Sequence, residues 1–124
     1  MTYQDKLTEL KMAFLRLKEA LPMVKDQLDK DGVIQRFEFT FELVWKTLRE
    51  FCAEKGKTEN NPKDIFRLCA DFGLLEDPQP WFDFLKNRNL ASHLYDEEVA
   101  ERIFTEIPAF VSALEPLLAK LENP

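Results

Sequence analysis

The strongest constraint on the fold of this chain is a run of apolar residues spaced alternately three and four positions apart. This seam consists of Ile34, Phe37, Phe41, Val44, Leu48 and Phe51. Because an α-helix has 3.6 residues per turn, that spacing places all six side chains on one face. Trp45 and Cys52 widen the seam, and Gly56 follows it, as glycine often does at the end of a helix. The pattern predicts a long amphipathic helix that carries this seam from Ile34 onward and is closed by Gly56.

Phe39 and Leu43 lie on the side of that predicted helix opposite the seam. A helix that is apolar on two sides is covered on two sides. The second cover is either another helix of the same chain or a second subunit, and the pattern leaves both open.

An earlier seam of the same spacing predicts the first helix. Its apolar positions are Leu7, Leu10, Phe14, Leu17, Leu21, Val24 and Leu28. Proline removes a backbone donor and crowds the preceding turn, so we expect a kink or a short break at Pro22. Asp31 and Gly32 are expected to end this first segment.

Three further helices are predicted from capping residues and apolar spacing. A short one begins at Asn61-Pro62 and stops at Gly73, a fourth begins at Asp77-Pro78, and the last begins at Asp96-Glu97-Glu98. Pro108 and Pro116 lie off the apolar seam of the last helix and are expected to bend it. Four longer helices and one short one predict an all-α, up-down bundle of five helices in a single domain, residues 1–124.

Charge and composition exclude several function classes. The net charge of −6 counts against a broad electrostatic binder of nucleic acids, although a small basic site can persist on an acidic chain. No stretch reaches the length of a transmembrane helix, and the polar start is not that of a signal peptide, so we expect a cytoplasmic protein with no membrane partner. Cys52 and Cys69 are far from any second ligand, which favours two buried thiols over a disulfide or a zinc site. With one histidine in the sequence, we expect neither a metal nor a cofactor.

The stretch Arg88-Asn89-Leu90-Ala91-Ser92-His93-Leu94-Tyr95 holds the only histidine of the chain. Arg88 supplies a cationic fork for a phosphate, and His93 can accept or donate a proton near neutral pH. The hydroxyl of Tyr95 can donate a hydrogen bond, accept one or be modified, although a tyrosine at a helix junction often only packs its ring. Together these groups are suited to binding and processing a phosphodiester.

The segments 34–46 (IQRFEFTFELVWK) and 88–95 identify a resemblance that runs nearly end to end. The chain resembles the nucleotidyltransferase substrate-binding proteins, a branch of the HEPN superfamily close to the HepT-like toxins. The resemblance implies a helical bundle that dimerises and is encoded beside a minimal nucleotidyltransferase. It also implies that Arg88 and His93 form a metal-independent RNA-cleaving site, with Asn89 as the polar residue that follows the arginine. Tyr95 would be the residue that the partner enzyme adenylylates to silence the toxin.

RNA cleavage through the 2′-hydroxyl requires a proton acceptor, a proton donor and a cation beside the phosphate. One chain supplies one imidazole, whereas a twofold dimer supplies two, provided that the motif lies near the symmetry axis. Candidates for the dimer face are Phe39, Leu43, Trp81 and Phe82, because aromatic residues often anchor interfaces. Glu38 and Glu42 are one turn apart, and Glu42 can pair with Lys46, so both are expected to be surface or interface charges.

Two main hypotheses follow. In the first, the chain is a dimeric endoribonuclease in which His93 acts as general base or acid, Arg88 stabilises the phosphorane and Asn89 orients the site. In the second, the same groove is a non-catalytic binding module that holds a substrate or nucleotide for a separate nucleotidyltransferase, with Arg88 as an anion clamp. A purely structural oligomerisation bundle is a third reading.

Overall fold

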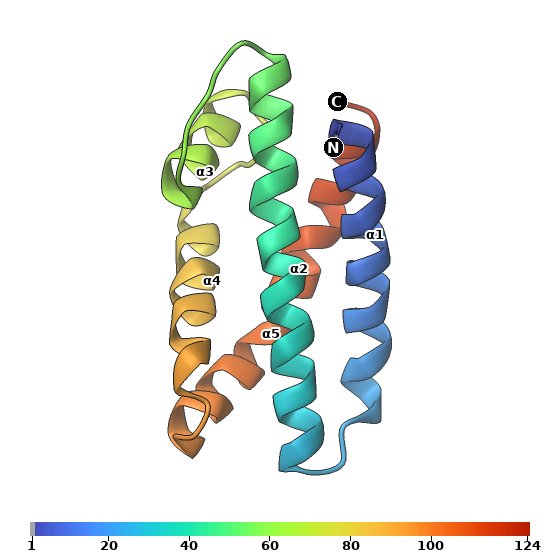
Figure 1. Cartoon of the computed structure of the whole chain (residues 1–124), viewed down its shortest axis with the longest axis vertical. Coiled ribbons are helices and arrows are strands. Elements are labelled where there is room, and N and C mark those ends of the chain that lie inside the picture. The colour runs from blue at the N-terminus through green and yellow to red at the C-terminus, as the bar shows by residue number, and fades with distance from the viewer. Residues whose placement is uncertain (1) are drawn as a thin grey trace.

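The computed structural model describes residues 2–124 and contains five α-helices joined by short connections. The helices are α1 (Tyr3–Ala20), α2 (Gln27–Glu54), α3 (Pro62–Asp71), α4 (Gln79–Leu90) and α5 (Glu97–Glu122), with 3₁₀ turns η1 (Leu21–Met23) and η2 (Ala91–His93). In Figure 1, α1 runs down, α2 runs up, α4 runs down and α5 returns behind α2. The predicted all-α class and the five helices are confirmed. With 10 and 12 residues, α3 and α4 are both short beside the other three.

The predicted helix ends agree with the capping geometry. The side chain of Asn61 accepts a hydrogen bond from the backbone N–H of Asp64, and Asp96 accepts one from the N–H of Glu98. These bonds satisfy backbone donors that the first turn of a helix leaves unpaired. Gly56 has a φ of 81°, a left-handed conformation that glycine adopts without steric cost. Residues 2–124 contain no helix long and apolar enough to cross a membrane.

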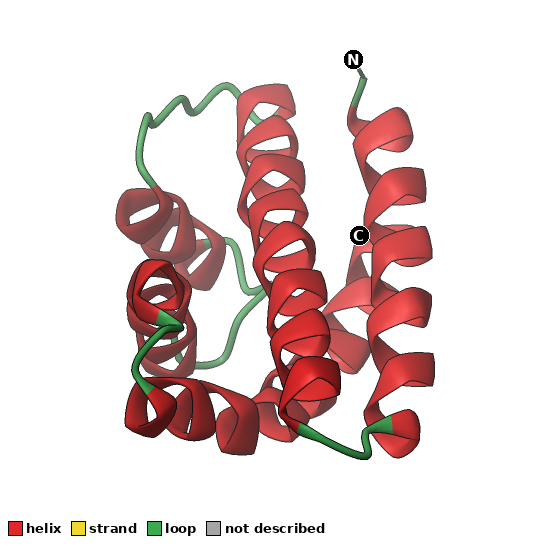
Figure 2. Ribbon diagram, turned by 60° about the horizontal axis from the view of Figure 1, so that its bottom comes forward, coloured by secondary structure: helices red, strands yellow, loops and turns green. Residues whose placement is uncertain are grey.

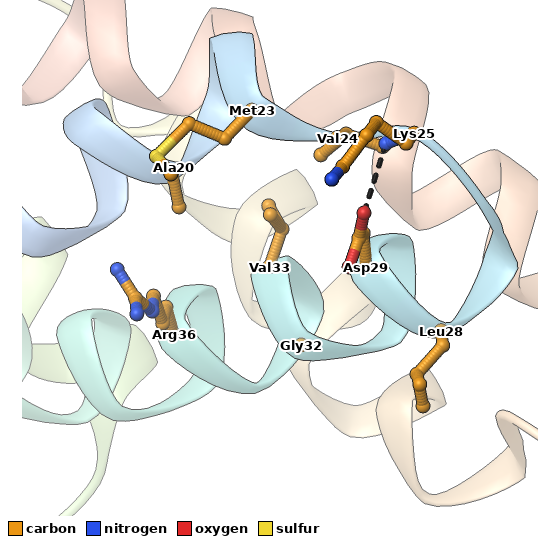
Figure 3. Close-up of a pocket in the computed structure, with 9 residues that line it drawn as sticks. All are labelled: Ala20, Met23, Val24, Lys25, Leu28, Asp29, Gly32, Val33 and Arg36. Atoms are coloured by element: carbon orange, nitrogen blue, oxygen red, sulfur yellow. Dashed lines mark hydrogen bonds between the residues drawn. The ribbon is translucent and has the colours of Figure 1, made fainter.

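The connection between α1 and α2 corrects one prediction. The chain leaves the helical path at Val24, which is extended with φ −68° and ψ 129°. The new helix α2 begins soon afterwards, because Asp26 caps it by accepting from the N–H of Asp29 at 2.9 Å. The predicted end of the first segment at Gly32 is therefore wrong, since Gly32 lies inside α2 (Figure 3). Glycine inside a helix costs only about 1 kcal/mol, which the cap and the packing of a 28-residue helix offset.

Leu28 does not belong to the apolar seam of the first helix. It lies in the first turn of α2, and 79% of its surface is exposed. The 3₁₀ turn at Pro22 and the extended residue after it rotate the chain out of register with α1. The three- and four-residue spacing continues in the sequence as far as Leu28, but α1 ends at Ala20.

An aromatic cluster centred on Phe110 of α5 holds three helices together. Its ring packs edge-on against Phe37 of α2 at 4.9 Å between centroids and against Phe84 of α4 at 5.3 Å. Trp81 and Phe41 complete the cluster at 6.1 and 6.3 Å. The cluster fixes α4, which carries Arg88 and leads into the η2 turn that holds His93, on α2 and α5.

The two chain ends lie side by side. The hydroxyl of Tyr3 donates to the backbone carbonyl of Leu121 at 2.6 Å, and burial raises the pKa of Tyr3 to about 12. Figures 1 and 2 show α5 slanting away below α4 and then turning up beside α1. Pro108 and Pro116 lie on the exposed side of this helix.

The cysteines lie in the core between α2 and α3. Cys52 and Cys69 are both fully buried and free, as predicted, with their Sγ atoms 3.7 Å apart. The hydrogen bond to Cys52, together with burial, raises the pKa of the Cys69 thiol. The Cys69 thiol is thus held in its neutral form, and burial keeps both sulfur atoms away from solvent.

Candidate functional site

Arg88, in the last turn of α4, faces α2. Its Nη1 donates to the carboxylate of Glu42 at 2.9 Å, and its guanidinium carbon lies 5.7 Å from the centre of the Phe41 ring. The Arg88 side chain is 29% exposed, and its buried Nε has no hydrogen-bond partner among residues 2–124. The arginine is therefore anchored at one nitrogen and retains unused donors.

Glu42 joins two cations, because it also pairs with Lys46 at 3.5 Å. That second pair was predicted from the spacing on one helix, whereas the pair with Arg88 was not. Glu42 and Arg88 are 46 positions apart, and no local pattern relates them. Burial raises the pKa of the neighbouring Glu38, an effect that the positive charge of Arg88 partly offsets.

A hollow of about 470 Å³ opens beside this ion pair, and we call it the Arg88 hollow. It is lined by Gln35, Glu38, Phe39, Glu42 and Arg88. Its rim thus combines two carboxylates, one guanidinium and one aromatic ring. The hollow therefore contains charges of both signs. An anion that binds Arg88 there must displace the carboxylate of Glu42 or bind Arg88 beside it.

His93 and Tyr95 lie at the turn between α4 and α5. The His93 Nδ1 atom is 3.3 Å from the Tyr95 hydroxyl oxygen, and the two rings meet edge-on. His93 is exposed, and Tyr95 is 84% exposed. The turn is fixed because the carbonyl of His93 accepts from the N–H of Asp96, the cap of α5. The ring of Tyr95 is therefore not core packing, and its hydroxyl is reachable from solvent.

Asn89 and His93 line a second hollow on the α3 side of α4, which we call the α4 groove. The groove has a volume of about 440 Å³ and is lined by Lys63, Gln79, Phe82, Asp83, Leu85, Lys86, Asn89, Leu90 and His93. Arg88 is absent from this lining, because adjacent residues of a helix point about 100° apart. Within one copy of the chain, Arg88 and His93 therefore line separate hollows.

Asn87 ties this end of α4 to α5. It is 3% exposed, and its amide nitrogen donates a hydrogen bond to the carboxylate of Glu106. Its amide oxygen has no partner within residues 2–124. Asn87 was not predicted as a site residue, because a polar residue beside Arg88 carries no signal of burial in the sequence.

The four residues predicted for a dimer face lie in three different places. Phe39 and Leu43 are half-buried and line a hollow of about 330 Å³ with α1, beside the 63% exposed Met12. Phe82 is half-buried in the α4 groove. Trp81 is only 4% exposed and packs inside the Phe110 cluster, so the structure corrects its assignment to the surface.

Another hollow, of about 310 Å³, lies at the connection between α1 and α2 (Figure 3). Its polar groups are largely used within the chain. The N–H of Lys25 donates to Asp29, and the guanidinium of Arg36 donates to the carbonyl of Arg16 at 2.6 Å. None of the predicted site residues lines it. Across residues 2–124, no three side chains of metal-ligating type are grouped closely enough to hold a metal ion.

Residues 5–123 match the family model for nucleotidyltransferase substrate binding protein like domains. The chain belongs to this family. Among curated proteins it is similar to the Probable ribonuclease HepT of Haemophilus influenzae, at 29% identity over 99% of this chain and 96% of that one.

Two solved structures share the fold of this family member. A crystal structure of a Thermus thermophilus protein has a TM-score of 0.84 and 33% identity, covering 90% of this chain and 98% of that one. A Haemophilus influenzae structure, described as revealing the fold of a substrate binding domain of a nucleotidyltransferase, has a TM-score of 0.83 and 29% identity. That match covers 94% of this chain and 99% of the other. The predicted family is confirmed.

Proposed function

We propose that this chain is a HepT-like, metal-independent endoribonuclease whose site is shared by two copies and which a cognate nucleotidyltransferase silences by adenylylating Tyr95. The observation that carries the proposal is the 3.3 Å contact between His93 Nδ1 and the Tyr95 hydroxyl at an exposed, fixed turn. It joins the only imidazole of the chain to an accessible hydroxyl. The similarity to a protein named Probable ribonuclease HepT supports the same assignment.

The chemistry uses groups that the turn leaves free. With Nδ1 directed at Tyr95, the Nε2 atom of His93 has no hydrogen-bond partner within residues 2–124. In a dimer, one neutral imidazole takes the proton of the RNA 2′-hydroxyl as that oxygen bonds to phosphorus. The protonated imidazole of the other copy gives its proton to the departing 5′-oxygen, which leaves a 2′,3′-cyclic phosphate. The guanidinium of Arg88 stabilises the charge on the phosphorane, and Asn89 orients the phosphate.

Dimerisation is required because Arg88 and His93 line separate hollows in one copy. Phe39 lines both the Arg88 hollow and the apolar hollow that contains Leu43. A contact between copies through Phe39 and Leu43 would therefore enclose the Arg88 hollow within the dimer interface. The exposed Met12 would add apolar area to the same contact.

Adenylylation of Tyr95 would inhibit this chemistry in two ways. The added phosphodiester is negative and lies beside His93, where it competes with RNA for the same cations. Its nucleoside also fills space that the RNA backbone needs. The 84% exposure of Tyr95 makes its hydroxyl accessible to a partner enzyme without local unfolding.

Cleavage is tested with the purified chain, single-stranded RNA and a chelator. The wild type is expected to give products ending in a cyclic phosphate, and His93→Ala and Arg88→Ala are expected to lower the rate by about 10²- to 10⁴-fold. Ser92→Ala, an exposed change in the same turn, is the matched control and should retain the rate. Absence of cleavage by the wild-type dimer would contradict the proposal.

Modification is tested by intact mass after co-expression with the neighbouring nucleotidyltransferase. Whole adenylyl units are expected on the wild type and none on Tyr95→Phe. The chain offers a matched control, because Tyr3 is its only other tyrosine and is 6% exposed. Tyr3→Phe should be modified like the wild type, and equal modification of Tyr95→Phe would contradict the assignment.

A second candidate is a non-catalytic subunit that binds a substrate or nucleotide for the nucleotidyltransferase. One observation favours it, because the related Haemophilus influenzae structure is described as revealing the fold of a substrate binding domain of a nucleotidyltransferase. This candidate predicts a tight complex with the transferase and no RNA cleavage by the pure dimer. The cleavage assay above separates the two candidates directly.

A further inference from the structure

The α4 groove contains Asn89 and His93 of the proposed site, together with residues that the proposed cleavage chemistry does not use. Phe82, Lys86, Asn89 and His93 follow one another at spacings of four, three and four along one face of α4 and its 3₁₀ extension. At 1.5 Å per residue, the distance along the helix axis from Phe82 to Asn89 is about 10 Å. The groove thus leads from an aromatic ring directly to the histidine of the proposed site.

Free positive charge collects at the far end of the groove. Lys63 of α3 and Lys86 of α4 both line it, and neither has a carboxylate within 4 Å among residues 2–124. The Lys63 ammonium lies 5.7 Å from the centre of the Phe82 ring. Asp83 is the only carboxylate in the lining, and its Oδ1 accepts from Gln79. On a chain of net charge −6, the two lysines without a carboxylate partner give the groove a local excess of positive charge.

The apolar wall of the groove complements these cations. Phe82, Leu85 and Leu90 are half-buried and present partly exposed apolar surface to the hollow. A volume of about 440 Å³ lies within the range of small-molecule sites and suits a nucleotide-sized group. Cations beside an aromatic and aliphatic wall are the combination that binds single-stranded nucleic acid, where phosphates meet lysine and bases stack on rings.

We propose that the α4 groove is a nucleotide subsite for single-stranded RNA, in which Lys63 and Lys86 bind a phosphate and Phe82 contacts the base adjoining the scissile bond. The inference rests on the proposed function for the role of His93 at the near end of the groove. Single strands are specified because the bases of a duplex are stacked and paired, so they cannot reach a ring recessed in a groove.

The test is binding of a fluorescent oligoribonucleotide that carries 2′-O-methyl groups, measured by anisotropy over a series of salt concentrations. This probe cannot be cleaved through the 2′-hydroxyl, so binding is measured apart from catalysis. Lys63→Ala with Lys86→Ala is expected to weaken binding and to reduce the salt slope of log affinity by about 0.7, because the two lysines together bind one phosphate. Phe82→Leu, which keeps apolar bulk but removes the ring, is expected to weaken binding about fivefold or more.

The matched control is Lys25→Ala with Lys57→Ala, which removes the same charge from residues that do not line the groove. The control should leave the slope unchanged. Equal losses in the two double variants would overturn the proposal, because the effect would then be one of net charge. The proposal would also be overturned if duplex RNA bound through the two lysines with the same affinity as the single strand. Binding of free ATP in place of RNA through these lysines would overturn it as well. Unchanged RNA affinity together with lost Tyr95 modification would identify the groove as a surface for the transferase instead.

Failure of this proposal and failure of the proposed function are distinguishable. If the protein binds the probe through Lys63, Lys86 and Phe82 but cleaves no RNA, the subsite is supported and the ribonuclease assignment is wrong. If the protein cleaves RNA through His93 but the double lysine variant has an unchanged salt slope, the ribonuclease assignment is supported and the subsite is wrong.

Discussion

Replacement of Phe110 by alanine tests whether the aromatic cluster holds the site-bearing helix in place. The Phe110 side chain is fully buried and packs against four aromatic rings, with three of its contacts edge-on at 4.9, 5.3 and 6.1 Å. Truncation of a buried phenylalanine removes its transfer free energy and leaves a cavity, at a cost of about 3–5 kcal/mol. That loss is a large part of the free energy of unfolding of an ordinary domain, which is about 5–15 kcal/mol.

The expected change in melting temperature follows from chain length. An unfolding entropy of about 2.1 cal/mol/K per residue gives ~260 cal/mol/K for 124 residues (2.1 × 124). A loss of 3–5 kcal/mol then lowers the melting temperature by about 12–19 °C. Circular dichroism during thermal and guanidinium unfolding measures both quantities.

The matched control lies on the same helix. Phe104 is half-buried, and Lys30 places its ammonium 5.2 Å from the centre of that ring. Phe104→Ala is expected to cost about 1 kcal/mol, since only part of the ring leaves a packed environment. A loss below about 1.5 kcal/mol for Phe110→Ala, or equal losses for the two variants, would refute the reasoning that the cluster on Phe110 joins α2, α4 and α5.

Three further predictions concern the pH dependence, the ion pair and the thiols. The raised pKa of Tyr3 contributes stability that is fully present below pH 10 and is lost as the pH rises through about 12. In Tyr3→Phe, the free energy of unfolding should therefore depend less on pH in that range, as measured by denaturant titration. An unchanged pH profile would contradict the role of the buried hydroxyl. Glu42→Gln removes the carboxylate that pairs with Arg88 and so frees the guanidinium for a phosphate. The salt slope of log affinity for single-stranded RNA, measured by anisotropy, should then steepen by about 0.7. An unchanged slope would show that Arg88 does not contact the RNA backbone. Cys52 and Cys69 should resist a thiol reagent in the native protein and both react after unfolding, and rapid native labelling would contradict their burial.

Local patterns predicted the helices because each signal acts within a few residues. Asn61 and Asp96 cap the helices that they were expected to cap, since a capping side chain bonds to an N–H two or three residues away. The wrong prediction that the first helical segment ends at Gly32 also follows from the short range of these patterns. A heptad pattern continues through a chain reversal, and only the extended backbone at Val24 and the cap at Asp26 show where one helix ends and the next begins.

The candidate site was predicted less completely, because its contacts join distant parts of the chain. The motif from Arg88 to Tyr95 was apparent, and the structure places His93 beside Tyr95 as neighbours in one turn. It also directs Arg88 toward Glu42, 46 positions away, a contact without any sequence signature. Trp81 was assigned to a surface because aromatic residues occur both in cores and at interfaces, and composition does not separate them.

The sequence by itself determined the helical class, the positions of the capping residues and the residue types available for phosphate chemistry, because these depend on spacing within a few turns. Only the tertiary structure decided which faces of α4 these residues occupy. Packing against Phe110 fixed the rotation of that helix, so that Arg88 meets α2 while Asn89 and His93 open into the α4 groove. A helix carries no preference for its own rotation until apolar side chains from other elements bury one of its faces.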